Sequence, residues 1–488
     1  MIGLHTAAEV RAAEAPLLAA LPEGALMQRA ATGLATVCLR LLGRPYGARV
    51  VLLVGAGNNG GDALIAGAQL ARRGARVHAV LLEPGRAHPA GLAAFRGAGG
   101  RTVSPGAGGP LLDRAHLVLD GIVGIGGSGG LRPPAAELAG RAAAGPALMV
   151  AVDVPSGVDA DTGAVEGAAF PATHTVTFGA VKPGLVVGDG RGHAGEVHLV
   201  DIGLGAVLPS PGAQQLTDAD AAARLPVPDA DDDKYSQGVV GVVAGSATYP
   251  GAGVLCTGAA LRTRPGLVRY AGTAADGVRA AWPEAIVTAG RPGDAGRVQC
   301  WVVGPGMGTD DDARSVLAEV LATDLPVLAD ADALTMLARD QDLVRGRRAP
   351  TVLTPHDREF ARFGEEVGPD RIGAARRLAA GLGAVVLLKG EATVVADPDG
   401  TAFVNATGTP WLATAGTGDV LSGIAGALLA SGLPAAEAAA VAAHVHGRAG
   451  QLAAARGPLL AGDLVRRLPE AVYRVRGVRA EHLPDSEP

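Results

Sequence analysis

Aromatic residues and cysteines are scarce in this chain of 488 residues. Phe, Trp and Tyr make up only 3% of it, and the cysteines are Cys38, Cys256 and Cys300. Because these three are odd in number and far apart, they indicate neither a disulfide framework nor a metal-ligand spacing, and they fit a reducing compartment. With so few aromatic side chains, we expect cores built from Val, Leu and Ala, in keeping with a hydrophobic content of 48%.

Other signals are also missing. The N-terminal residues show no basic segment followed by an apolar one, and no apolar run reaches the roughly 18 residues that a membrane span requires. The net charge of −6 gives no electrostatic reason to expect nucleic acid or acidic lipid as a partner. Gly and Pro together fall below the roughly 25–30% typical of disorder. We expect a soluble cytoplasmic protein of two domains.

The first half begins with helical periodicity over residues 5–43, broken at Pro22. Residues 49–62 then read as a strand, a Gly-rich turn and a helix start, which is the arrangement that binds phosphate in open α/β sheets. Asn58 and Asn59 interrupt the usual dinucleotide fingerprint and, with Asp62, bring unusual polarity to the turn. The alternative is a purely structural turn, since Asn and Gly are common in turns.

Three further apolar segments, at residues 76–83, 117–122 and 148–157, are expected to be buried parallel strands that end in polar residues or Gly. Ligands gather at the carboxyl ends of such strands. The oxygen donors of Asn59, Asp120 and Ser156, with one carboxylate among them, suit a monovalent cation better than zinc. Asp153 and Lys182 are candidates for acid–base chemistry or phosphate binding, although a lysine in a Gly-Pro turn is by default solvated.

Asn58-Asn-Gly-Gly-Asp62 after a strand, with Val152-Asp-Val-Pro-Ser-Gly157 downstream, resembles the NAD(P)H-hydrate epimerase domain, the YjeF N-terminal family, over about residues 5–205. Ala63, where Gly is usual, and a more Gly-rich loop at 124–130 depart from that family. The resemblance implies a Rossmann-like three-layer α/β/α domain that interconverts R and S NAD(P)H hydrate, with K⁺ on Asn59, Asp120 and Ser156. It implies hydrate contacts for Asn58, Asn59, Gly60, Gly61, Asp62, Gly124, Ile125, Gly126, Gly127, Ser128, Gly129, Gly130 and Asp153.

The second half is organised around residues 413–422. Gly416 and Gly418 permit close approach of a ligand to the backbone, and an apolar helix is expected to start at Asp419. Amides at a helix N-terminus favour phosphate. A carboxylate beside such a site suggests a base that takes a proton from a hydroxyl group about to meet a phosphoryl group. The alternative is an ordinary helix-capping aspartate.

Further strands of this half end in Gly turns or in His, Lys or Asp side chains, at residues 238–246, 300–308, 326–334, 351–357 and 384–393. Alone, His356 could be a turn histidine and Lys389 a surface charge, but together these groups favour a nucleotide and phosphoryl site. His444 and His446 lie two apart on an expected helix and so point in different directions, which favours a structural role.

Six segments in this order resemble the ADP-dependent NAD(P)H-hydrate dehydratase, the YjeF C-terminal family of the ribokinase-like fold, over about residues 215–475. They start at Lys234, Gly304, Asp330, Thr354, Lys389 and Gly416. Gly253, where Ala is usual, and Asp357-Arg358, in place of Pro-Gly, depart from that family. The resemblance implies that Lys389, Gly390, Glu391, Ala392, Thr393 and Gly418 hold ADP, and that Gly253, Gly306, His356 and Asp419 face the hydrate.

We therefore expect an α/β chain that begins with a Rossmann-like epimerase domain (1–208). A linker and the start of the second domain (209–237), a ribokinase-like dehydratase domain (238–475) and a frayed tail (476–488) follow. The expected catalytic residues are Asp153 and Asp419, with Mg²⁺ assisting the second. The family also suggests a homo-oligomer. Two alternatives remain: an ATP-dependent small-molecule kinase with a passive first domain, and a nucleotide-binding scaffold with inactive sites.

Overall fold

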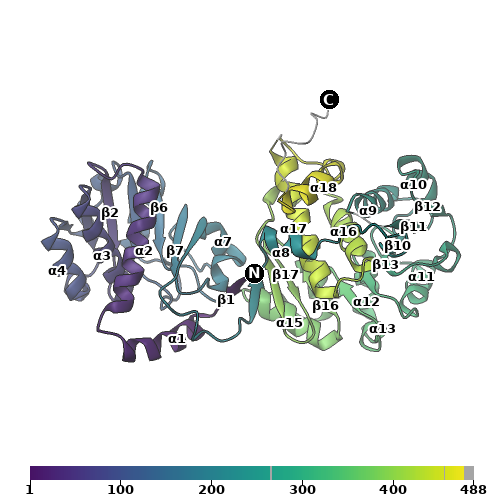
Figure 1. Ribbon diagram of the computed structural model, residues 1–488, viewed down its shortest axis with the longest axis horizontal. Helices are drawn as coiled ribbons and strands as arrows, with labels where there is room; N and C mark the ends of the chain where they lie inside the picture. Colours follow the sequence, from purple (N-terminus) through teal and green to yellow (C-terminus); the bar gives the residue numbers. More distant parts are fainter. Residues whose placement is uncertain (264–265, 456, 478–488) are drawn as a thin grey trace. The chain divides into compact units, whose positions relative to one another are not determined.

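The computed structural model describes residues 1–263, 266–455 and 457–477 (Figure 1). The chain divides into an N-terminal unit, Gly3–Ala213, and a C-terminal unit that comprises Met1–Ile2 and the chain from Gln214 onward. Among the described residues, none of the helices combines the length and apolar character that crossing a membrane demands.

The N-terminal unit is built on a seven-stranded sheet of order β4-β3-β2-β5-β6-β7-β8, in which all neighbours are parallel. The expected strands at 76–83, 117–122 and 148–157 are confirmed as β3, β5 and β6. Its strands are β2 (Arg49–Val54), β3 (Arg76–Leu81), β4 (Arg101–Val103), β5 (Leu117–Gly121), β6 (Leu148–Val152), β7 (His174–Phe178) and β8 (Glu196–Val200). Its helices are α1 (Ala7–Ala20), α2 (Ala25–Leu42), α3 (Asn58–Arg72), α4 (Pro89–Gly97), α5 (Gly109–Leu112), α6 (Ala135–Ala143) and α7 (Gly188–Ala194).

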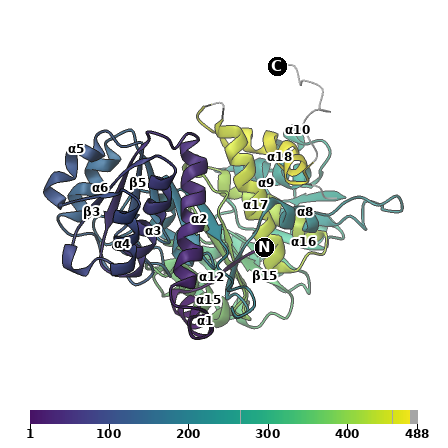
Figure 2. The ribbon, with the colours of Figure 1, turned by 60° about the vertical axis from the view of Figure 1, so that its left-hand side comes forward.

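Strand residues alternate between two hydrophobic cores, one on each face of this sheet. Leu52 and Leu119 join a core with α1, α2 and α3, whereas Leu53 and Val118 join a second core with α5 and α6. Figure 2 shows the strands between α2 and the pair α5 and α6. Because both faces are covered, the strands carry continuous apolar runs, and the three-layer architecture follows.

The second sheet has eleven strands in the order β1-β9-β18-β17-β16-β15-β14-β13-β10-β11-β12. Strands β10 to β18 belong to the C-terminal unit, whereas β1 and β9 contain the residues at which the chain is divided. The seven neighbouring strands β12, β11, β10, β13, β14, β15 and β16 are parallel to one another. Strands β17 and β18 add an antiparallel hairpin beside β16. The strands are β1 (Ile2–Leu4), β9 (Ala213–Gln215), β10 (Val239–Val243), β11 (Leu267–Ala271), β12 (Ile286–Thr288), β13 (Cys300–Val303), β14 (Val327–Ala329), β15 (Thr351–Leu353), β16 (Val385–Leu388), β17 (Thr393–Ala396) and β18 (Ala402–Asn405).

Helices cover both faces of this sheet. Figure 1 shows α9 and α16 to α18 on one side and α12, α13 and α15 on the other. The main core joins alternate strand residues, such as Val240 and Val302, to the first group. The helices are α8 (Asp218–Arg224), α9 (Pro250–Thr263), α10 (Ala275–Ala281), α11 (Asp311–Leu321), α12 (Asp332–Arg339), α13 (Asp342–Arg345), α14 (Asp357–Phe360), α15 (Arg371–Leu382), α16 (Thr417–Ala430), α17 (Ala435–Ala454) and α18 (Ala461–Val475).

The stretch 209–237, expected to be a linker and the start of the second domain, contains β9 and α8. Leu216, Ala221 and Leu225 from this stretch enter the core of the C-terminal unit. Four prolines within the stretch obscured this short helix, whose Thr217 and Asp220 form a capping box. Of the expected tail, residues 478–488 lie outside the described part of the chain.

Each sheet reverses its strand order once among its parallel strands. In the N-terminal unit the reversal lies between β2 and β5, and in the C-terminal unit it lies between β10 and β13. Open α/β sheets bind ligands outside the carboxyl ends of the strands at such a reversal. The segments after these four strands contain residues that the sequence singled out. Asn58 to Asp62 form the first turn of α3, and the Gly-rich loop at 124–130 follows β5. The Gly turns that begin at Gly245 and Gly304 follow β10 and β13.

Candidate active sites

A cavity of about 1010 Å³ opens beside the strand reversal of the N-terminal unit. It is lined by parts of the loops that follow β2 and β5 and by the start of α3. The predicted residues that line it are Asn58, Asn59, Asp62, Gly124, Ile125, Gly126 and Asp153. Gly127 to Gly130 are not among its lining residues. At Gly130 an added Cβ would collide with the Glu166 carbonyl, so packing accounts for that glycine.

Asp153 and Lys182 form a buried ion pair at the base of the cavity. The Lys182 side chain is fully buried, and its Nζ lies 2.6 Å from Asp153 Oδ1. The ammonium group also donates to the Phe178 carbonyl at 2.9 Å and to Thr177 Oγ1 at 3.1 Å. The alternative of a solvated Lys182 is therefore wrong, because the turn after β7 directs this side chain inward. Asp153 has a φ of 68°, a left-handed conformation that Asp tolerates better than most residues.

A second carboxyl group faces the same pair. Asp62 is buried, and its Oδ1 lacks a hydrogen-bond partner among the described residues. Burial, followed by the charges of Asp153 and Glu14, raises the pKa of Asp62 well above its usual value. Burial also raises the pKa of Glu14, which reaches the cavity from α1. A protonated carboxyl at Asp62 has a hydrogen to donate to a bound ligand.

Asp120 and Ser156 meet beneath the loop that follows β5. Ser156 donates through its amide to Asp120 Oδ2 at 2.8 Å and through its hydroxyl to Oδ1 at 2.7 Å. Burial raises the pKa of Asp120 to about 6, although these bonds oppose the rise. Asn59 belongs to the first turn of α3, and its buried Nδ2 has no hydrogen-bond partner among the described residues. A Cβ added to Gly124 would lie 3.0 Å from Asn59 Oδ1, so that loop passes directly over the amide.

In the C-terminal unit the Gly-rich turn at 413–416 leads into α16, which begins at Thr417, two residues before the expected start at Asp419. Gly416 is the residue that caps the helix, with a φ of 86° that favours glycine. Asp419 is the third residue of the helix, so the capping-aspartate alternative is wrong. Buried His446 holds this turn, because its Nε2 lies 2.9 Å from the Thr417 carbonyl. Burial lowers the pKa of His446 to about 4, which leaves the ring neutral and supports the structural role expected for it.

Lys389 lies beside the start of α16 and pairs with Asp330. Lys389 Nζ is 2.7 Å from Asp330 Oδ1, and Ser422 of α16 donates to Asp330 Oδ2 at 2.8 Å. A Cβ on Gly418 would lie 3.7 Å from Lys389 Nζ, so the bare backbone of the helix start faces the ammonium group. Burial lowers the pKa of Lys389, but the carboxylates of Asp330 and Glu359 outweigh it and the pKa is raised overall. The surface-charge alternative for Lys389 is therefore wrong.

The surroundings of Asp419 raise the pKa of its carboxyl group. Burial, then the charge of Asp330, raises its pKa to about 7, while Lys389 lowers it and Asp332 raises it. A base is most effective when its pKa lies near the working pH. Between Asp330 and Asp332, Ala331 has a φ of 51°, a strained conformation that costs roughly 1–3 kcal/mol and is typical of functional sites.

The neighbouring strands bring the remaining predicted residues to the same edge. His356 caps α14 directly after β15, and its Nδ1 accepts from the Arg358 and Glu359 amides. Gly390 to Ala392 form the turn between β16 and β17, beginning one residue after Lys389. Gly306 lies against the start of α9, because an added Cβ would be 2.9 Å from Ala252 Cβ.

Gly253 and Asp357, which depart from the dehydratase pattern, each have a structural explanation. A Cβ on Gly253 would lie only 2.8 Å from the Ala244 carbonyl, which already accepts from the Tyr270 hydroxyl. Asp357, in place of the usual proline, makes two hydrogen bonds of 2.9 Å with Arg371. Arg371 also donates to the Lys389 carbonyl at 2.9 Å, so Asp357 supports the turn that carries Lys389.

Sequence reasoning missed two groups in these sites. Glu14 gave no signal, because it lies on helix α1, far from any motif. Asp330 stood in a segment that we quoted, but no role was assigned to it. An Asp at the end of an apolar strand can indicate a site residue, because a buried carboxylate requires polar partners.

Comparison with known proteins covers both units. Residues 23–184 match the family described as YjeF-related protein N-terminus, and residues 240–470 match the family described as NAD(P)H-hydrate dehydratase. The chain is 55% identical over 478 residues to the bifunctional NAD(P)H-hydrate repair enzyme Nnr of Mycobacterium leprae (strain TN), covering 97% of this chain and 98% of that protein.

Two solved structures cover 54% of this chain. A ribokinase-like superfamily protein from Enterococcus faecalis V583 is 26% identical, with 96% of its length covered and a TM-score of 0.50. The ADP/ATP-dependent NAD(P)H-hydrate dehydratase from Bacillus subtilis, co-crystallised with ATP/Mg²⁺, is 29% identical, with 98% covered and a TM-score of 0.48.

Proposed function

The chain belongs to the family of bifunctional NAD(P)H-hydrate repair enzymes, and we propose that each unit performs one of the two reactions at the cluster described above. The N-terminal unit interconverts the R and S hydrates, and the C-terminal unit dehydrates the S hydrate at the expense of ADP. The observation that carries this assignment is that each unit has its own buried carboxylate–lysine pair at the carboxyl ends of its parallel strands. The pair follows β6 and β7 in the N-terminal unit, and β14 and β16 in the C-terminal unit.

In the N-terminal unit, we propose that Asp62, Asp153 and Lys182 act on the hydroxyl group at C6 of the nicotinamide ring. A proton from Asp62 allows that hydroxyl to leave as water. The carboxylate of Asp153 stabilises the cationic ring, and Lys182 fixes the position of Asp153 through the 2.6 Å contact. Water then adds to either face and returns the proton to Asp62, so the two epimers exchange.

The donors of Asn59, Asp120 and Ser156 are suited to K⁺. They offer an amide oxygen, a carboxylate and a hydroxyl, and the Val123 carbonyl lies 3.1 Å from Ser156 Oγ. Hard oxygen donors with a single carboxylate fit a weakly held monovalent cation. Bound there, K⁺ would supply positive charge beneath the loop that carries Gly124 to Gly126 and so favour one loop position.

In the C-terminal unit, we propose that Asp419 removes the proton from the C6 hydroxyl of the S hydrate. The hydroxyl oxygen attacks the β-phosphorus of ADP and AMP leaves. Phosphate then departs from C6, and the ring is restored as NAD(P)H. The amides at the start of α16 and the ammonium group of Lys389 stabilise the charge that develops on the transferring phosphoryl group.

Mg²⁺ would neutralise phosphate charge in this reaction. Asp330 uses both of its carboxylate oxygens on Lys389 and Ser422, which leaves them poorly placed to hold a metal. Mg²⁺ usually keeps several waters and binds through one or two carboxylates and substrate phosphates. This pattern fits the site, with the ion carried mainly by ADP.

The test is recovery of NADH, followed by its near-ultraviolet absorbance, from a mixture of R and S NADH hydrate with ADP–Mg²⁺ or ATP–Mg²⁺. Complete recovery with ADP is expected from the unmodified chain. Asp153→Asn should stop recovery once the S form is spent, and Asp419→Asn should prevent recovery while the epimers still exchange. Absence of recovery with either nucleotide would contradict the proposal and favour the kinase or scaffold alternatives.

A further inference from the structure

Two histidines and a glutamate cluster on the last two strands of the N-terminal sheet. His174 of β7 is paired in register with Glu196 of β8. His198 lies two residues beyond Glu196, and because side chains alternate along a strand, Glu196 and His198 share one face of the sheet. The register of β7 and β8 therefore places three potential metal ligands side by side.

The ligand atoms are spaced as a metal ion would require. His174 Nδ1 and His198 Nε2 are 3.1 Å apart. Glu196 Oε2 lies 3.6 Å from His174 Nδ1, and Glu196 Oε1 lies 3.8 Å from His198 Nε2. In tetrahedral zinc sites the ligands stand about 2.0–2.1 Å from the ion, which places them roughly 3.3–3.4 Å from one another. The observed separations lie close to this spacing.

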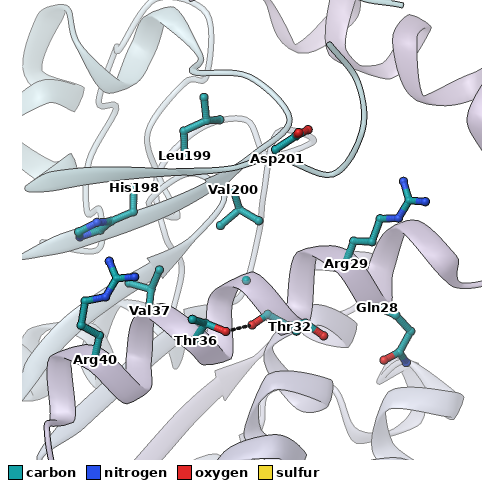
Figure 3. A pocket seen from close by; sticks show the side chains of 11 residues that line it. Gln28, Arg29, Thr32, Thr36, Val37, Arg40, His198, Leu199, Val200 and Asp201 are labelled. Atoms are coloured by element: carbon teal, nitrogen blue, oxygen red, sulfur yellow. Dashed lines mark hydrogen bonds between the residues drawn. The ribbon is translucent and has the colours of Figure 1, made fainter. Parts of the chain in front are cut away.

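The surroundings allow an ion to enter. His198 lines a pocket of about 770 Å³ between α2 and β8, shown in Figure 3 with Arg40 and Thr36 on the helix side. The Glu196 side chain is 68% exposed. The cluster is also remote from the catalytic cavity. His174 begins β7, whereas Phe178, which lines that cavity, ends the same strand roughly 13 Å away.

We propose that His174, Glu196 and His198 form a binding site for a divalent transition metal such as zinc. Two imidazoles and one carboxylate are a donor set that zinc accepts, with water in the fourth position. Because β8 is the edge strand of its sheet, a bound ion would link β8 to β7 and so stabilise the N-terminal unit. The ion takes part in neither reaction. Arg40, which lines the same pocket, limits the affinity through its positive charge.

The test is calorimetric titration of zinc into the full chain, treated with chelator and kept in K⁺ buffer without nucleotide. One zinc per chain is expected, with a higher Tm for the zinc-bound protein. His198→Ala should abolish this binding, and Glu196→Gln should weaken it by about tenfold or more. Arg40→Gln should tighten it. The matched control is His193→Ala, because His193 lies on α7 outside the cluster and bonds to the Asp189 carbonyl.

Epimerase activity measured without zinc shows that each variant is folded. If His198→Ala loses epimerase activity, the zinc affinity of Glu196→Gln becomes the deciding measurement, because this exposed side chain can be replaced without disturbing the core. The proposal is overturned if the unmodified chain binds no zinc, or if Glu196→Gln binds zinc as tightly as the unmodified chain. Equal losses in His193→Ala and His198→Ala would also overturn it.

Discussion

The dehydratase reaction of the C-terminal unit should lose rate as the pH falls through about 7, because Asp419 must be ionised to act as a base. Its pKa of about 7 comes from burial and the charge of Asp330, opposed by Lys389. With that pKa, about half of the enzyme is active at pH 7 and about a tenth at pH 6, and the rate levels off above about pH 8.

Two substitutions should move this acidic limb in opposite directions. Asp330→Asn removes the negative charge that raises the pKa of Asp419, so the limb should shift to lower pH by roughly one unit. Lys389→Met removes the positive charge that lowers this pKa, so the limb should shift to higher pH. The matched control is Asp276→Asn, which removes a fully exposed carboxylate of the same unit and should leave the limb unmoved.

The assay is the initial rate of NADH recovery from purified S hydrate at fixed ADP–Mg²⁺, reported as kcat/KM against pH. The pH dependence of kcat/KM reports the pKa values of groups in the free enzyme. The midpoint of the pH–rate curve can therefore be read in each variant even where its maximal rate is lower. The assignment of Asp419 is refuted if no limb appears near pH 7. It is also refuted if the two variants shift the limb in the same direction.

Three further substitutions have expected outcomes. Asp419→Asn should cut dehydratase kcat by about 10²–10⁴ and spare epimerisation. Asp419→Asn should also stabilise the C-terminal unit at pH 8, by no more than about 4 kcal/mol in urea unfolding. A carboxyl group with a raised folded-state pKa contributes stability below its usual pKa of 3.8 and loses this contribution as the pH rises through about 7. At pH 8 the ionised Asp419 therefore lowers the free energy of unfolding, and the neutral Asn removes this loss. Lys182→Met should destabilise the N-terminal unit by about 3–5 kcal/mol, whereas adding Asp153→Asn should recover part of the loss. Hydrogen exchange of the β6 and β7 amides measures the loss in Lys182→Met and its partial recovery in the double variant. Equal protection in these two variants would argue against the buried pair. Ser156→Ala should raise the K⁺ concentration for half-maximal epimerisation about tenfold, and an unchanged K⁺ dependence would remove Ser156 from the ligand set.

Much of the architecture could be predicted from local patterns. Continuous apolar runs indicated the parallel strands, and the turns at Asn58 and Gly416 marked two helix starts. Carboxyl ends of parallel strands share one edge of a sheet, so the grouping of site residues followed from those strands. The two-domain α/β fold and the bifunctional assignment are both confirmed. The individual site roles, including K⁺, stay predictions.

The buried partners could not be predicted in the same way. Lys182 in a Gly-Pro turn and Lys389 after a strand both looked solvated when considered alone. Each is buried because a carboxylate from another strand end, Asp153 or Asp330, meets it in the fold. Helix α8 was overlooked for a related reason, since its few apolar residues matter only once the core they enter is known.

The sequence by itself determined where strands end and which of them end in reactive side chains, because hydrophobic periodicity and glycine turns are local properties. Only the tertiary structure decided which of those side chains meet. The pKa of about 7 at Asp419 depends on burial and then on the charge of Asp330, which lies far away in the chain. The cluster of His174, Glu196 and His198 likewise depends on the register between β7 and β8. The burial of a side chain and its distance from other charges depend on which segments pair in the fold. The pairing of strands is in turn determined by the packing of the whole sheet.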